Sequence, residues 1–343
     1  MDKPKHGHEH KHKRRVVITS REGTLRDADL EGVNLSGQNL SAKDMSDSNM
    51  QGARLNQANL QGANLQETNL SEAELVGANL QGANLYAANL SEAQLNQANL
   101  QGANLQEANL REAELVGANL EGANLYSANL EEAQLHQANL RGANLQEANL
   151  SEAELAEANL EGANLAMANL SESSLVDANL TGANLQGANL SECDLVNAHL
   201  QGANLQEANL NEVMLHGADL RGVNFQEAEL GEVDMAEATL HGANMEMVDL
   251  REANLERADL TGANLHEANL RDANLTKANL TGADLRDASL RDANLQRANL
   301  RDAKLQGASI RDANFEGATL PDGTTYREGM DLSPFGVSGK PLV

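Results

Sequence analysis

Leucine recurs at every fifth position through most of this 343-residue chain. In the stretch Ser71–Leu90 each leucine also follows an alanine two places earlier; the leucines are Leu75, Leu80, Leu85 and Leu90. Residues five apart on a helix lie about 140° apart, and an odd spacing on a strand sends alternate side chains to opposite faces. Neither element buries these leucines together. The chain must therefore turn by a fixed angle every five residues and wind around its own core, as a stacked solenoid does.

The outward residues indicate how many five-residue units close one coil. Acidic residues recur every 20 positions from Glu72 to Asp312, and glycines recur every 20 positions from Gly62 to Gly282. The two sets are offset by ten residues. This spacing predicts a square coil of four units, with a carboxylate edge on the side opposite a glycine edge.

Units such as GANLQ, EANLS, GADLR and EANLE follow the pattern A(N/D)LXX from about Leu25 to Leu320. This pattern resembles the pentapeptide-repeat family, in the leucine-centred form common among cyanobacterial members. The resemblance implies an all-β fold, a right-handed quadrilateral β-helix with leucine and alanine inward and the other three residues outward. The 60 units of residues 25–320 correspond to about 15 coils. At a strand spacing of about 4.8 Å, the predicted rod is roughly 70 Å long.

Segments of different composition flank the repeat of residues 25–320. Residues 16–24 contain a Val-Val-Ile run and are predicted to form a strand that covers the first coil, because an uncovered solenoid end exposes core and strand edges. Residues 321–343 begin with the turn signal PDG and contain apolar residues that can fold over the last coil. The solenoid is thus expected to be capped at both ends. Some family members dimerise through a C-terminal element, so both a monomer and a dimer through this end stay open.

Residues 1–15, MDKPKHGHEHKHKRR, are predicted to be a disordered, His-rich basic tail. Its alternating histidines suit loose chelation of zinc, nickel or copper, and they are His6, His8, His10 and His12. The alternative is a soluble basic tail without a metal. Its KHKRR run can meet nucleic acid, an acidic partner or the acidic body of the same chain.

Charge is distributed unevenly along the chain. Residues 23–250 carry six basic and 34 acidic residues, a net charge of −28, whereas residues 251–320 carry ten basic and eleven acidic residues. Residues 1–22 have a net charge of +4 with neutral histidines. Direct binding of nucleic acid by the rod is therefore disfavoured, because phosphates would meet carboxylates.

The chain has one cysteine, Cys193, at an inward alanine position, where a small buried side chain is expected. No disulfide can form within the chain, which fits a reducing cytosol. The sequence has no apolar run long enough for a membrane span or a signal peptide. We therefore expect a cytoplasmic protein without a membrane segment.

A rod filled with leucine and alanine offers no pocket in which polar groups converge, so we expect neither an enzyme nor a cofactor. The carboxylates form a regular ladder rather than a pair in contrasting environments. Larger inward residues gather in one stretch, either because its core packs differently, with a slight bend, or through sequence drift. They are Val213, Val223, Phe225, Val233, Met235, Met245 and Val248.

The first functional hypothesis is a rod-like protein-interaction or scaffold protein with an acidic surface and an unknown protein partner. Tyr86 and Tyr126 lie 40 residues apart, which places them on one edge, two coils or roughly 10 Å apart. Exposed tyrosines are favoured interface anchors. Duplication of one ancestral tyrosine explains the pair equally well. The acidic edge supplies further interface candidates, namely Glu72, Glu92, Glu112, Glu132 and Glu152.

The alternative is a DNA mimic that modulates a type II topoisomerase (gyrase), as the resemblance to the acidic quinolone-resistance members of the family implies. A charge of −28 on about 11 coils corresponds to one charge per roughly 2 Å, close to the about 1.7 Å of duplex DNA. Against this reading, gyrase binders of the family favour phenylalanine centres and several carry loops that interrupt the repeat. This chain has leucine centres almost throughout and an uninterrupted repeat.

Overall fold

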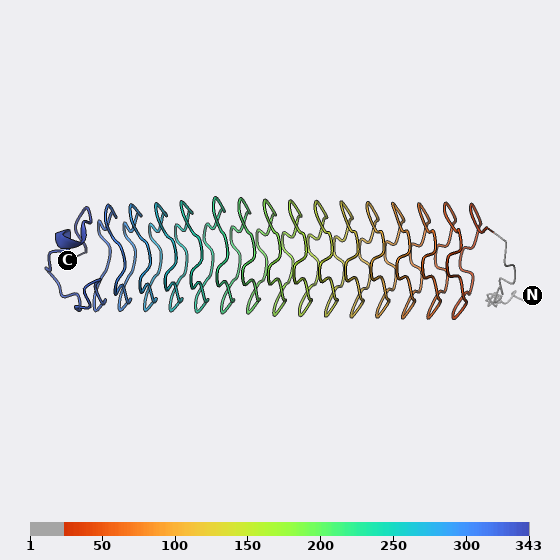
Figure 1. Cartoon of the computed structure of the whole chain (residues 1–343), viewed down its shortest axis with the longest axis horizontal. Helices are drawn as coiled ribbons and strands as arrows, with labels where there is room; N and C mark the ends of the chain where they lie inside the picture. Colours follow the sequence, from red (N-terminus) through yellow and green to blue (C-terminus); the bar gives the residue numbers. More distant parts are fainter. Residues whose placement is uncertain (1–23, 343) are drawn as a thin grey trace, which may run out of the picture.

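Each five-residue unit forms one side and one corner of a square coil, and the coils stack into a rod (Figure 1). The structure is a computed structural model that describes residues 24–342. The predicted tail of residues 1–15 with its four histidines, and the predicted capping strand apart from Thr24, lie outside the described residues.

Isolated parallel β-bridges join neighbouring coils. Each bridge links residues 20 apart, from Asp29↔Asn49 to Asn299↔Thr319, so the predicted period of four units per coil is confirmed. Only one residue per side forms a bridge, because a corner follows two residues later. Within residues 24–342 no longer strand is present, and the one helix is η1, a 3-10 helix at Ser333–Phe335.

The unit Asn79–Ala83 shows how one repeat satisfies all five of its backbone N–H groups. The amides of Asn79 and Leu80 donate to the previous and the next coil, at 2.9 and 2.7 Å. The amide of Gly82 donates to the next coil at 2.9 Å, and that of Ala83 closes the turn on Leu80 O at 2.9 Å. The fifth, Gln81 N–H, donates to the Asn79 side-chain oxygen at 3.2 Å. The asparagine before each leucine therefore completes the backbone pairing that burial requires.

Asparagine side chains also join one coil to the next. Asn79 Nδ2 donates to Asn59 Oδ1 at 3.1 Å, and the same bond recurs from Asn99 to Asn79 at 3.2 Å. Hydrogen-bonded asparagine ladders therefore connect successive coils.

The second residue of every corner has a left-handed backbone. Gly82 has φ +63°, and a Cβ there would meet no atom within 4 Å. Glycine is therefore favoured at this position by the left-handed backbone and not by a lack of space. Glu72 occupies the equivalent place with φ +58°. A non-glycine residue in this region costs roughly 1–2 kcal/mol, so the acidic edge is backbone-strained where the glycine edge is not.

Leucine and alanine fill the interior as predicted. Leu75 and Ala78 have no exposed surface, and one continuous core runs the length of the repeat. Cys193 is fully buried, and its Sγ lies 2.7 Å from Leu170 O. Burial raises the pKa of this thiol to about 11. A thiol in this state is a packing group and not a nucleophile.

The C-terminal segment crosses the open end of the solenoid (Figure 1). Thr325 forms an antiparallel bridge with Thr319, and Ser338 forms a parallel bridge with Ser309. Tyr326 and Leu332 join the core cluster with 6% and 5% of their surface exposed, and Phe335 packs against it half-buried.

Candidate interaction surface

Tyr86 and Tyr126 lie on one corner of the coil, which we call the tyrosine edge. It consists of the paired corner residues 66–67, 86–87, 106–107, 126–127, 146–147 and 166–167. Both tyrosines are half-buried on the outside of the rod. Each stands before a small residue, Ala87 or Ser127, where the neighbouring coils carry a glutamate.

Each tyrosine is held by a carboxylate of the following coil. Tyr86 Oη donates to Glu107 Oε2 at 2.9 Å, and Tyr126 Oη donates to Glu147 Oε2 at 2.7 Å. These hydrogen bonds raise the pKa of both phenols, because the carboxylate stabilises the protonated hydroxyl. The two rings are therefore fixed in position at the surface.

The other oxygen of each glutamate is also paired. Gln106 Nε2 donates to Glu107 Oε1 at 3.1 Å, and Gln146 Nε2 donates to Glu147 Oε1 at 3.3 Å. The arrangement of glutamine, glutamate and preceding tyrosine is thus built twice, two coils apart.

A methionine that the sequence analysis did not select continues the tyrosine edge. Met167 is 63% exposed and lies over Gly187, where a Cβ would collide with the methionine sulfur. Met247, 80 residues later, occupies the same corner position and is 62% exposed. Met167 and Met247 lie 40 and 120 residues after Ser127, the second corner residue beside Tyr126, so the sequence spacing contains the signal that identifies them.

The acidic edge holds its five candidate residues at the left-handed corner position. Glu72, Glu92, Glu132 and Glu152 are exposed, and Glu112 is half-buried. Arg111 forms ion pairs with Glu112, Glu131 and Glu132. An open hollow of about 350 Å³ lies beside Glu132, Gln134 and Glu154. Among these five residues the edge is a series of like charges with one arginine inserted, and further along Arg251, Arg271, Arg291 and Arg311 directly precede its carboxylates, so the repulsion is relieved locally.

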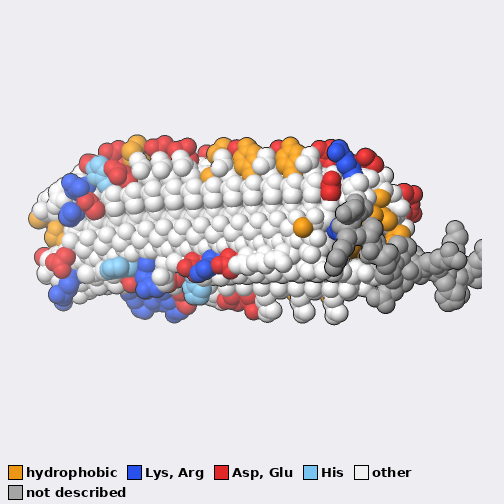
Figure 2. Space-filling model, turned by 45° about the vertical axis from the view of Figure 1, so that its right-hand side comes forward, with side chains coloured by type: hydrophobic (Ala, Val, Ile, Leu, Met, Phe, Trp, Pro, Cys, Tyr) orange, Lys and Arg blue, Asp and Glu red, His pale blue; other side chains and the backbone are white. Residues whose placement is uncertain are grey.

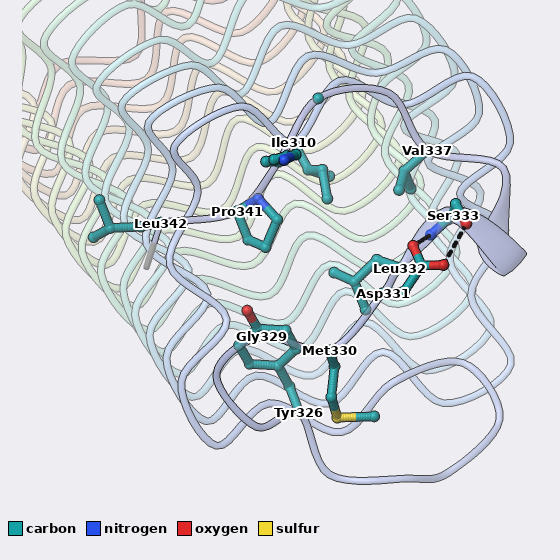
Figure 3. A pocket seen from close by; sticks show the side chains of 12 residues that line it. Ile310, Tyr326, Gly329, Met330, Asp331, Leu332, Ser333, Val337, Pro341 and Leu342 are labelled. Atoms are coloured by element: carbon teal, nitrogen blue, oxygen red, sulfur yellow. Dashed lines mark hydrogen bonds between the residues drawn. The ribbon is translucent and has the colours of Figure 1, made fainter.

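The C-terminal segment and the last coil border a half-open hollow of about 530 Å³ with apolar and polar lining (Figure 3). Ile310, Leu332 and Val337 line it together with Asp331 and Lys340. The Asp331 carboxylate accepts hydrogen bonds from the amide and hydroxyl of Ser333, at 2.9 and 2.8 Å, which lowers the pKa of this carboxyl. An acid held ionised by a neighbouring turn is unsuited to proton transfer near neutral pH.

No cluster of three or more potential metal ligands occurs in residues 24–342. The same part of the chain contains no helix that is long and apolar enough to cross a membrane. Figure 2 shows a largely uncharged flank, with acidic and basic side chains gathered along the edges and hydrophobic side chains standing singly among them. Rigid edges, rather than clefts, are the distinctive surface features.

A long solenoid of square coils defines a repeat protein of the quadrilateral β-helix class. Models of pentapeptide repeats match overlapping segments between residues 28 and 320. The chain belongs to the pentapeptide-repeat family. No curated protein is significantly similar to it.

Among solved structures, the chain is 39% identical to HetL from the cyanobacterium Nostoc sp. strain PCC 7120, a pentapeptide repeat protein involved in heterocyst differentiation regulation. That match covers 70% of this chain and 92% of HetL, with a TM-score of 0.24. Rfr23 from the cyanobacterium Cyanothece 51142 is 31% identical over 35% of this chain and 85% of its own, with a TM-score of 0.18. QnrB1, a plasmid-mediated fluoroquinolone resistance protein, is 20% identical over 50% of this chain and 89% of its own, with a TM-score of 0.42.

Proposed function

We propose that this protein is a non-enzymatic, cytoplasmic scaffold that binds a protein partner along the tyrosine edge. The supporting observation is the doubled arrangement in which Glu107 and Glu147 fix the rings of Tyr86 and Tyr126 at the surface. A tyrosine whose ring is already ordered loses little conformational entropy on binding, which favours its use as an interface anchor.

The rest of the rod serves as a support for that edge. We propose about 15 coils, with the C-terminal segment closing one end and residues 16–24 closing the other. The leucine core makes a stiff column, so the anchors keep their separation when a partner approaches. Dimerisation through the C-terminal end would present two such edges.

Affinity capture from the extract of the native host tests this function. The variant Tyr86→Ala/Tyr126→Ala is compared with Val76→Ala/Val116→Ala, whose two valines lie on the opposite corner with the same 40-residue separation. We expect the tyrosine variant to lose the partner and the valine variant to keep it. Equal capture by both variants would remove the tyrosine edge as the binding surface.

A second candidate function, modulation of a type II topoisomerase by DNA mimicry, is favoured by the acidic edge. Acidic side chains occupy its left-handed corner position at every coil from Glu72 to Asp312. A supercoiling assay with purified gyrase and micromolar protein tests it. Unchanged supercoiling, together with unchanged sensitivity to a quinolone, would exclude it.

A further inference from the structure

Apolar side chains on the tyrosine edge occur in alternate coils. Tyr86 and Tyr126 are first corner residues 40 residues apart, and Met167 is the second corner residue two coils beyond Tyr126; the intervening coils carry glutamate. With neighbouring coils about 4.8 Å apart, the two tyrosine positions stand about 9.6 Å apart. The edge therefore presents a spatial period that a bound segment must match.

The charge on this edge has one sign. The coil before Tyr86 contributes Glu67, and the intervening coils contribute Glu107 and Glu147, all exposed. The two flanking sides of the coil carry uncharged asparagine ladders, represented by Asn104 Nδ2 to Asn84 Oδ1 at 3.0 Å and Asn109 Nδ2 to Asn89 Oδ1 at 3.1 Å. A segment lying along the edge thus meets apolar anchors and carboxylates, and its complementary charge is positive.

The period distinguishes among the conformations that a bound segment can take. A strand repeats its side chains on one face every 6.6–6.8 Å, roughly, and a helix with a seven-residue repeat advances about 10.5 Å. A polyproline II helix has three residues per turn and advances about 9.3 Å. Over the step from Tyr86 to Tyr126, polyproline II departs from the edge by about 0.3 Å and the helix by about 0.9 Å.

We propose that the tyrosine edge binds a proline-rich segment in polyproline II conformation that carries lysine or arginine between its prolines. Residues three apart in the segment lie against Tyr86 and Tyr126, and its basic side chains reach Glu107 and Glu147. Proline-rich segments dock on aromatic surfaces with little loss of conformational entropy, because polyproline II is already populated before binding. This inference rests on the proposed function and specifies its partner.

A synthetic peptide of four Pro-Pro-Arg repeats with a fluorescent label tests the proposal by anisotropy titration with the full chain. Controls are a scrambled peptide of the same composition, a peptide of four Pro-Pro-Glu repeats, and a basic amphipathic helix with a seven-residue leucine repeat. We expect binding of the Pro-Pro-Arg peptide alone, weakened by salt because the carboxylates are exposed. Stronger binding of the helix, or equal binding of the scrambled peptide, would overturn the proposal.

Protein variants locate the site. Tyr86→Ala/Tyr126→Ala should weaken peptide binding by about tenfold or more, as loss of an anchor does, whereas Val76→Ala/Val116→Ala should leave it unchanged. Tyr86→Phe keeps the ring and should weaken binding less than Tyr86→Ala. Equal affinity of all variants would contradict the proposal.

The capture experiment and the peptide titration test the proposed function and the proposed partner separately. If capture of the cellular partner depends on the tyrosines but the Pro-Pro-Arg peptide does not bind, the interaction function stands and the polyproline II partner is wrong. If capture does not depend on the tyrosines, the proposed function itself is wrong, whatever the peptide does.

Discussion

Residues 73–172 and residues 213–252 follow the same repeat but pack differently. We call them the regular and the irregular stretch. In the regular stretch every inward residue is leucine or alanine, and each turn bond from an alanine amide to the preceding leucine carbonyl measures 2.9–3.1 Å. In the irregular stretch the corresponding bonds of Val213, Val223 and Val248 measure 3.3, 3.2 and 3.4 Å.

The backbone pairing between coils also weakens in the irregular stretch. The amide of Glu232 lies 3.4 Å from Arg251 O, whereas that of Glu212 lies 3.0 Å from Gly231 O. Within residues 24–342, no backbone acceptor is found for the amides of Glu227, Leu230 and Val233. The coils stand visibly further apart at one edge in this part of the rod (Figure 1). Of the two readings that the sequence left open, different packing is thus supported.

The asparagine ladders differ between the two stretches as well. In the regular stretch side chains other than asparagine are confined to one of the four ladders, at Glu74, Gln94, Glu114, Gln134 and Glu154. In the irregular stretch they occupy three of the four ladders, at Met214, Asp219, Glu229, Asp234, Thr239 and Asp249. Larger inward residues push the turns outward, and the missing amides remove bonds that would resist this. The repeat therefore tolerates a larger inward residue alone or a missing ladder amide alone, but the two together loosen the junction between coils.

Loss of a central side chain should cost most where packing is tightest. Leu115 and Met235 occupy the centre of the same side of the coil, and both are fully buried. We expect Leu115→Ala to lower the free energy of unfolding by about 2–5 kcal/mol, and Met235→Ala to lower it less, because the looser coils and the adaptable methionine site can relax. Urea denaturation followed by circular dichroism measures both. A larger loss for Met235→Ala would show that the irregular stretch is not loose.

A valine placed in the regular stretch should reproduce the irregular packing. Ala113 lies in the same inward column as Val213 and Val233 and is fully buried, with a turn bond of 3.0 Å to Leu110 O. We expect Ala113→Val to destabilise the protein by about 1–3 kcal/mol through overpacking. Ala113→Ser, which adds less bulk and matches the natural Ser173 of that column, is the control. An unchanged denaturation midpoint for Ala113→Val would mean that the valines do not cause the loosening.

Much of this fold follows from the sequence because its information is local and repeated. The leucine period, the alanine two places earlier and the 20-residue identity of the corners predicted the coil and its interior. The asparagine ladder through Asn79 belongs to the same repeated information, because one residue type recurs there every 20 positions. The corners were less predictable. Nothing in the residue preferences indicates a left-handed backbone for Glu72, because the position is imposed by closure of the coil.

The candidate site was only partly predictable for the same reason. The pairing of Tyr86 with Tyr126 on one edge could be read from their separation. The bond from Tyr86 to Glu107 depends on a side-chain conformation and on the small neighbour Ala87, which periodicity does not specify. Met167 was missed because it occupies the second corner position rather than the first.

Acid should affect the irregular stretch more than the regular one. Asp219 takes the ladder position that Asn139 holds in the regular stretch, and a hydrogen bond from Arg221 lowers the pKa of this carboxyl to about 2. Because the pKa is lowered in the folded state, the ionised carboxylate stabilises the fold fully at pH values above the ordinary pKa of about 3.8. This stabilisation is lost as the pH falls through about 2. We expect Asp219→Asn to cost about 1 kcal/mol near neutral pH, because the ion pair with half-exposed, solvent-screened Arg221 is lost while the new amide faces His199, which has no amide oxygen to accept from it.

Denaturation of Asp219→Asn and the unsubstituted protein between pH 2 and pH 7 measures this contribution. The difference between their free energies of unfolding should shrink as pH falls from about 4 to about 2. A difference that does not change with pH would show that the aspartate acts through its shape and not through its charge.

The smallest effect should come from restoring one alanine in the irregular stretch. Val233→Ala removes two methyl groups from a position whose amide has no backbone acceptor in the described chain. We expect a change in global stability below about 1 kcal/mol, because the lost apolar burial and the regained turn bond offset each other. Hydrogen exchange resolves what denaturation does not. The amides of Leu230 and Val233 should become protected to the level of Leu110 and Ala113, and unchanged exchange at Leu230 would place the cause of the open junction in Phe225 or in the missing ladder amides instead.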